Sequence, residues 1–107
     1  IVFLSGLIGW DADGKFPQPD SFLAQAELAL KNIVAVLAEG QAAPEHIVRM
    51  TWYVVDKHEY RQSSKQLGVV YREIIGRHFP AMTAVQVVAL MEDQARLEIE
   101  VMAVVPE

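Results

Sequence analysis

Two carboxylates, Glu98 and Glu100, lie two residues apart in an apolar stretch near the end of the chain, residues 96–105. Side chains of a β-strand alternate between its two faces, so both carboxylates share a face with Met102. A strand face that mixes carboxylates with apolar side chains indicates an interface or a cleft rather than open water. The chemistry that a carboxylate offers in such a place is that of a general base.

The cations and histidines fit structural roles better than a second catalytic group. Arg96 precedes Glu98 by two residues, about 6–7 Å along a strand, and is expected at the rim of the sheet, with a role as a nearby cation as the alternative. Arg77 and His78 follow a predicted helix, where cations complement the helix dipole, and contact with a ligand is the alternative. His46 and His58 are too far apart to indicate a metal site. The sequence has no Ser-His-Asp motif and no phosphate-binding glycine loop.

Hydrophobic periodicity predicts a strand–helix–strand–helix–strand–strand order, an α+β chain. Asp20 is a good N-cap for the first helix, which Gly40 ends, and Asp56 with Glu59 has the spacing of a capping box for the second. Glu92, Asp93 and Gln94 are expected to form a hairpin between the last two strands. The predicted strands are residues 1–8, 46–55, 83–91 and 96–105, and the predicted helices are residues 20–40 and 56–76.

Two helices cover only one face of a four-stranded sheet. In the strand at 46–55, Val48, Met50, Trp52 and Val54 are expected to face the helices. The other face then carries Arg49, Thr51, Tyr53, Glu98 and Met102 without cover, and Glu100 is expected to pair there with Arg49. An uncovered face of this kind predicts a homo-oligomer.

Composition excludes several classes of protein. The chain has 107 residues, enough for one domain, and 52% of them are hydrophobic. No apolar run reaches the ~20 residues of a membrane helix, so we expect a soluble, cytoplasmic protein. The absence of cysteine excludes disulfides and thiolate chemistry, and a formal charge of −5 with scattered basic residues argues against nucleic-acid binding. Because the chain opens directly at Ile1 in a strand pattern, we expect that a preceding segment has been removed or left out.

Several sequence blocks together resemble the Rid (YjgF-like) family of reactive-intermediate enamine/imine deaminases. They are Ser5-Gly6, Val48-x-x-Thr51-x-Tyr53-Val54-x-Asp56, Tyr71, Phe79-Pro80-Ala81 and Leu97-Glu98-Ile99-Glu100-Val101. The resemblance implies a chorismate-mutase-like α+β fold, and a trimer whose sheets form a central barrel with small-molecule clefts between subunits. It also implies that the first strand of the family precedes Ile1.

The resemblance also implies roles for individual residues. Glu98 would hold the hydrolytic water, and Ser5 and Gly6 would contact the ligand. Met82 stands where deaminating members carry an arginine that grips a carboxylate, and Gly68 stands where an asparagine is frequent. The candidate cleft is lined by Ser5, Gly6, Met82, Thr83, Ala84 and Glu98, with no metal and no cofactor.

Three functions remain open from the sequence. The first is hydrolysis of an enamine or imine to a carbonyl compound and ammonia, with a substrate that lacks an α-carboxylate or holds it differently because of Met82. The second is a non-catalytic ligand-binding or regulatory trimer. The third, an endoribonuclease or translation inhibitor, ranks lowest because phosphate contacts need clustered Lys and Arg.

Overall fold

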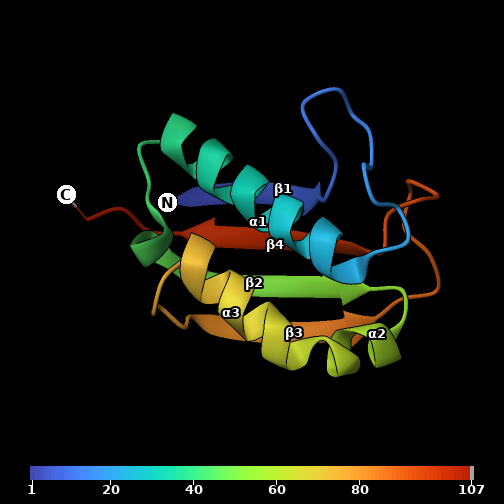
Figure 1. The fold of residues 1–107 in the computed structure, drawn as a ribbon. Coiled ribbons are helices and arrows are strands. Elements are labelled where there is room, and N and C mark those ends of the chain that lie inside the picture. Colours follow the sequence, from blue (N-terminus) through green and yellow to red (C-terminus); the bar gives the residue numbers. More distant parts are fainter. Residues whose placement is uncertain (107) are drawn as a thin grey trace.

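Four strands form one mixed sheet in the spatial order β1-β4-β2-β3, and the helices pack on one face of it (Figure 1). The computed structural model describes residues 1–106. The elements are β1 (Val2–Ile8), α1 (Phe22–Glu39), the 3₁₀ helix η1 (Pro44–His46), β2 (Ile47–Val54), α2 (Lys57–Gln62), α3 (Ser64–Ile74), β3 (Ala81–Gln86) and β4 (Leu97–Ala103). The predicted α+β class is therefore confirmed.

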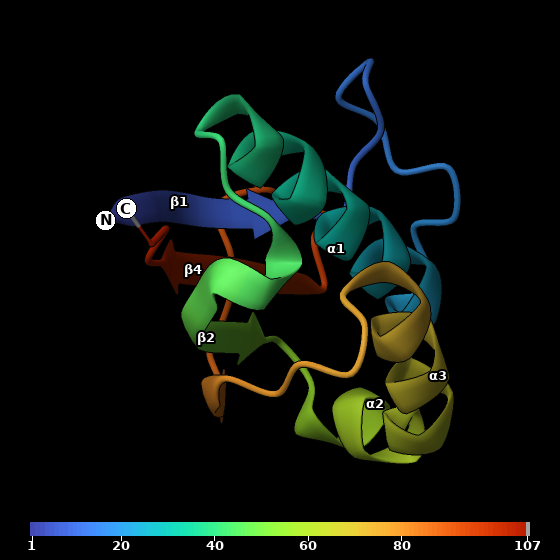
Figure 2. The ribbon, with the colours of Figure 1, turned by 90° about the vertical axis from the view of Figure 1, so that its left-hand side faces the viewer.

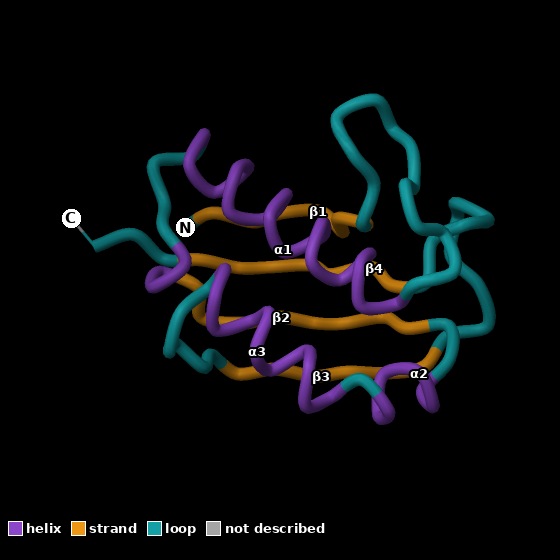
Figure 3. Tube along the Cα trace, viewed as in Figure 1, coloured by secondary structure: helices purple, strands orange, loops and turns teal. Residues whose placement is uncertain are grey.

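The sheet connectivity differs from the prediction for the last two strands. β4 lies between β1 and β2 and runs antiparallel to both, whereas β3 pairs in parallel with β2. The predicted hairpin between these two strands is therefore wrong, because the chain from residue 87 to 96 passes from the edge to the middle of the sheet (Figure 3). β3 also begins two residues earlier than predicted and ends at Gln86 rather than at residue 91.

The helix ends are set by local capping hydrogen bonds, and they differ from the prediction at Asp20 and at Ser63. Ser21, rather than Asp20, caps α1, because its hydroxyl accepts a hydrogen bond from the amide of Ala24 at 3.1 Å. Asp56 caps α2 as predicted and accepts from the amide of His58 at 2.8 Å. The expected single helix is broken at Ser63 into α2 and α3.

Helices α1 and α3 bury the predicted core against one face of the sheet, and Figure 2 shows the two layers from the side. β4 alternates as predicted, with Leu97, Ile99, Val101 and Ala103 buried. In β2 the alternation slips at its start, because the pairing with β4 shifts between Ile47 and Arg49. Ile47 is consequently buried, and Val48, which was expected to face the helices, is 44% exposed.

The face of the sheet opposite the helices has no covering layer in the part of the chain that the structure describes (Figure 2). β1 and β3 are its two edges. Apolar side chains are exposed along both, with Phe3 on β1 and Met82 and Val85 on β3. Edges and faces of this composition are surfaces for pairing with another chain.

Candidate functional site

The Ser5-Gly6 pair forms a β-bulge directly beside Glu98. Leu4 pairs with Val101 and Leu7 pairs with Ile99, so Ser5 and Gly6 together stand opposite the single residue Glu100. Bulges of this kind occur preferentially at sheet edges and next to active sites. Gly6 has no side chain, and a Cβ built on it would overlap the Glu98 carboxylate. The bulge therefore allows the carboxylate to lie against the backbone at position 6.

Tyr53 lies between the two carboxylates on the open face. It stands opposite Glu98 in the β2–β4 register, and its hydroxyl donates a hydrogen bond to Glu100 Oε1 at 2.6 Å. That hydrogen bond, followed by desolvation and the charges of Glu100 and Glu98, raises the pKa of Tyr53 above its usual value of 10. The expected partner of Glu100, Arg49, forms no ion pair with it among the described residues. Glu100 is thus occupied by Tyr53, while Glu98 faces the bulge.

The structure brings only part of the predicted site together within one chain. Gly6 and Glu98 are adjacent at the β1 side of the sheet. At the opposite edge, Met82 pairs with the buried Met50 and Ala84 pairs with the buried Trp52, so both share the helix-covered face. Thr83 lies between them in β3, so its side chain is on the opposite, open face. The candidate residues therefore form two groups at opposite edges of the sheet.

Arg96 does not stand beside Glu98. It precedes β4, and its guanidinium lies 2.7 Å from Glu59 Oε2 and 3.5 Å from Asp20 Oδ1, while Nε donates to the carbonyl oxygen of Pro19 at 2.8 Å. Arg96 thus ties α2 to the segment before α1. The alternative role of Arg96, as a cation for a ligand beside Glu98, is therefore wrong. The Glu59 carboxylate contacts Arg96 and does not form the predicted capping box.

His78 has a structural role. Its Nε2 donates to the carbonyl oxygen of Ile47 at 2.6 Å, and its own carbonyl oxygen accepts from Tyr71 Oη at 2.7 Å. These contacts fix the turn between α3 and β3. The neighbouring Arg77 is exposed.

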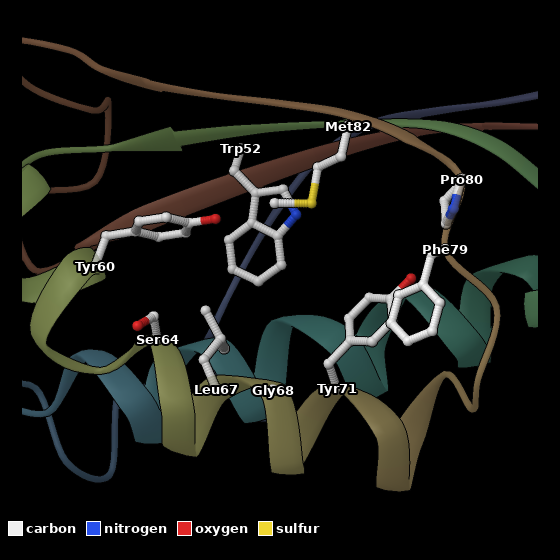
Figure 4. A pocket seen from close by; sticks show the side chains of 9 residues that line it. All are labelled: Trp52, Tyr60, Ser64, Leu67, Gly68, Tyr71, Phe79, Pro80 and Met82. Atoms are coloured by element: carbon white, nitrogen blue, oxygen red, sulfur yellow. The ribbon is translucent and has the colours of Figure 1, made fainter.

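A cavity of about 330 Å³ lies between α3 and the helix-covered face of β2 and β3. Figure 4 shows its lining, which is Trp52, Tyr60, Ser64, Leu67, Gly68, Tyr71, Phe79, Pro80 and Met82. Sequence reasoning placed Trp52 in the core and Met82 in a cleft but did not find this cavity. The available signal was Gly68, a residue without a side chain on a helix face that otherwise carries large ones. A second hollow of about 270 Å³ lies on the open face and includes Phe3, Arg49 and Glu100.

Residues 1–106 contain no cluster of three or more His, Cys, Asp or Glu side chains that could hold a metal ion. Across the same residues no helix is both long and apolar enough to span a bilayer.

The sequence model of the endoribonuclease L-PSP family matches residues 1–105. The chain belongs to this family, which is the Rid (YjgF/RutC) family of the resemblance. The RutC family protein UK114 of Drosophila melanogaster is 30% identical over 102 residues, which are 95% of this chain and 70% of that protein. The human 2-iminobutanoate/2-iminopropanoate deaminase is 27% identical and is matched over 96% of this chain and 72% of its own.

The fold is also similar to that of solved Rid-family structures. The crystal structure of Escherichia coli TdcF with bound serine superposes with a TM-score of 0.80 at 29% sequence identity, covering 97% of this chain and 80% of that one. The sheet with helices on one face is therefore shared with these relatives.

Proposed function

We propose that this protein is a homotrimer with a small-molecule cleft between protomers, in which Glu98 promotes hydrolysis of an enamine or imine to a carbonyl compound and ammonia. The single observation that carries this proposal is the Glu98 carboxylate resting against the Ser5-Gly6 bulge, at an edge of an uncovered sheet face. The deaminase activity named for the human relative supports the class of reaction.

The positions of the two residue groups support a cyclic assembly. β1 and β3 are the two edge strands of one protomer. If the β1 edge of one protomer meets the β3 edge of the next, the Ser5, Gly6 and Glu98 group of the first lies next to the Met82, Thr83 and Ala84 group of the second. A head-to-tail contact of this kind closes into a ring, and a three-membered ring would bury the open faces inside.

The chemistry in such a cleft needs one base and one positioning element. Glu98 accepts a proton from water as the water oxygen bonds to the C=N carbon, and the nitrogen gains a proton. In the resulting carbinolamine, the protonated Glu98 returns its proton to the amine nitrogen, the C–N bond breaks with its electron pair leaving on ammonia, and the hydroxyl loses its proton as C=O forms. The backbone at Gly6 orients the substrate against Glu98, because no side chain at position 6 separates the two.

Met82 limits the range of imines that we expect as substrates. A thioether donates no hydrogen bond to a carboxylate and carries no charge, so it cannot provide the bidentate grip of a guanidinium. Arg96, the cation that lies two residues from Glu98 in sequence, is held by Glu59, Asp20 and Pro19. We therefore expect imines without an α-carboxylate to be better substrates than 2-imino acids.

A direct test compares imines generated in situ from neutral amines with imines generated from amino acids, with ammonia release as the readout. The proposal expects turnover of the first class above the spontaneous rate. Turnover of neither class would contradict it.

The second candidate function is a ligand-binding trimer without catalysis, and the observation that favours it is Met82 itself. Met82→Arg separates the two candidates. Activity gained on 2-iminobutanoate would mean that only the anchor was missing and that the rest of the site is catalytic. If Met82→Arg binds the substrate but releases no ammonia, the non-catalytic function is the correct one.

A further inference from the structure

The cavity between α3 and the β2–β3 pair belongs to the cleft that the proposed function assigns to Met82, and its lining carries no formal charge. Aromatic rings frame it: Trp52 meets Tyr60 edge-on with ring centroids 6.1 Å apart, and Tyr71 stacks on Phe79 at 5.8 Å. A volume of about 330 Å³ lies in the range of sites for small organic molecules. The lining therefore suits the apolar body of a ligand but offers nothing to an anionic group.

A cation lies at the rim of this cavity, beside Gly68. The position that a Cβ would take at Gly68 lies 3.4 Å from Arg72 Nη1. Arg72 follows Gly68 by four residues on α3, and long side chains of a helix point back towards its N-terminus. Gly68 lines the cavity and Arg72 does not. The missing side chain at position 68 thus leaves room for a guanidinium at the mouth of the cavity.

The Arg72 guanidinium is available to a ligand. The side chain is exposed, and among the described residues it forms no ion pair, whereas Arg96 is held by Glu59. Lys65 precedes Arg72 by seven residues, so it lies two turns away on the same side of α3 and is also exposed. The planar fork of a guanidinium matches the two oxygens of a carboxylate. This rim is therefore suited to an anionic group.

The place of Arg72 determines where in the ligand that anionic group lies. Figure 4 shows Gly68 on the helix side of the cavity and Met82 on the strand side. An anion held by Arg72 is thus across the cavity from Met82, where the family resemblance places an arginine. The proposed assembly brings Glu98 of the neighbouring protomer to the Met82 side. The C=N carbon and the anionic group then lie at opposite ends of the ligand.

We infer that Arg72 is a specificity-determining residue of this cleft, and that it binds a carboxylate separated from the C=N carbon by an apolar, ring-sized body. The inference rests on the proposed function for the position of the C=N carbon. It agrees with the poor use expected of 2-imino acids, because their carboxylate is bonded directly to that carbon.

Three carbonyl compounds, each the hydrolysis product of an imine, form matched probes. 4-Acetylbenzoate carries its carboxylate across the ring from the carbonyl group, 4-acetylbenzamide replaces it by a neutral amide, and phenylglyoxylate carries it on the carbonyl carbon. Binding is followed by the ¹⁵N-labelled indole signal of Trp52, which lines the cavity, with Trp10 as the reference. We expect 4-acetylbenzoate to bind about tenfold or more tightly than either of the others.

Substitutions on the two helices assign this preference to one side chain. Arg72→Ala should lower the affinity for 4-acetylbenzoate about tenfold and leave that for 4-acetylbenzamide within about twofold. Arg72→Lys keeps the charge without the fork and should recover part of the loss. Arg61→Ala removes the same charge from an exposed position of α2 outside the lining, and should leave both affinities unchanged.

The inference is overturned if 4-acetylbenzamide or phenylglyoxylate binds as tightly as 4-acetylbenzoate, if no probe gives a saturable Trp52 shift, or if Arg61→Ala weakens binding as much as Arg72→Ala. Ammonia release from imines distinguishes this result from the proposed function. A preference that depends on Arg72 in a protein that releases no ammonia would support the inference and remove the proposed function. Ammonia release without that preference would do the reverse.

Discussion

The Glu98 carboxylate lies so close to the backbone of Gly6 that any side chain at position 6 would overlap it. The two residues come from neighbouring strands, β1 and β4, and the bulge at Ser5-Gly6 is what brings them together. A family pattern of Ser-Gly in one strand and Leu-Glu-Ile-Glu in another thus corresponds to a single local contact. This contact is where we place the reacting water.

Gly6→Ala should reduce activity more than stability. The added methyl group meets the flexible end of Glu98, which can move away, so we expect unfolding free energy to fall by less than about 1 kcal/mol. The displaced carboxylate should lower ammonia release at least tenfold. Gly9→Ala is the contrast, because its methyl group would overlap the backbone carbonyl of Gln25 in α1 and should cost about 1–3 kcal/mol. Equal losses of stability in the two variants, by urea denaturation, would contradict this assignment.

Arg96→Ala should destabilise the fold without altering the site. The side chain contacts Glu59 and the carbonyl oxygen of Pro19 at 2.7 and 2.8 Å, and a hydrogen bond that involves a charged group contributes about 1.5–3 kcal/mol. The contact with Asp20, whose side chain is fully exposed, adds little. We expect urea unfolding to show a loss of about 2 kcal/mol, with ammonia release per folded molecule unchanged. Arg96→Lys should recover only part of the loss, because an ammonium cannot reach all three partners. A fall in activity with normal stability would return Arg96 to the catalytic site.

The sequence predicted the elements and the core well, because long amphipathic patterns such as those of α1 and β4 determine which side is buried. It misplaced features that depend on a single residue or on pairing between distant strands. The bulge at Val48 exchanges the buried and exposed positions of Ile47 and Val48 at the start of β2 with no signal in composition, and the break at Ser63 lies within an unbroken helical pattern. The β3–β4 hairpin was inferred from proximity in the chain, whereas β4 pairs between β1 and β2.

For the candidate site, residue types identified the carboxylate but not its surroundings. Glu98 could be selected from the family pattern, and the bulge that supports it became evident only from the β1–β4 register. Arg96 was assigned to the wrong face because strand alternation was extended one residue beyond the start of β4 at Leu97. The separation of Met82 from Glu98 follows from strand order, which the sequence did not provide.

Phe3→Glu should dissociate the proposed oligomer. Phe3 is on the edge strand β1 and is 73% exposed in the single chain, so a charge there would be placed in the expected interface. Val36→Glu on the outer side of α1, at 42% exposure, is the matched control. Sedimentation should give three times the chain mass for wild type and Val36→Glu, and a smaller mass for Phe3→Glu. A wild-type protein that sediments as a monomer would contradict the inter-protomer cleft.

Stability should decrease above pH 10 as tyrosines ionise. Burial raises the pKa of Tyr60 and of Tyr71, and the hydrogen bond to Glu100 raises the pKa of Tyr53. The folded state therefore favours the neutral phenols. Their stabilising contribution is complete below the unfolded pKa of about 10 and is lost as the pH rises through the higher folded values. Phenolate absorbance should show all three tyrosines titrating above pH 10 in the folded chain and near 10 in urea, whereas equal titrations in both states would contradict these environments.

The most direct test of the account measures ammonia release from imines of neutral amines by the wild-type protein and by Glu98→Gln. The amide keeps the shape of the side chain against Gly6 but cannot accept a proton from water, so we expect a loss of about 10²–10⁴-fold at unchanged stability and oligomeric state. Wild-type turnover that survives Glu98→Gln undiminished, or no wild-type turnover at all, would contradict the assignment of Glu98 as the base.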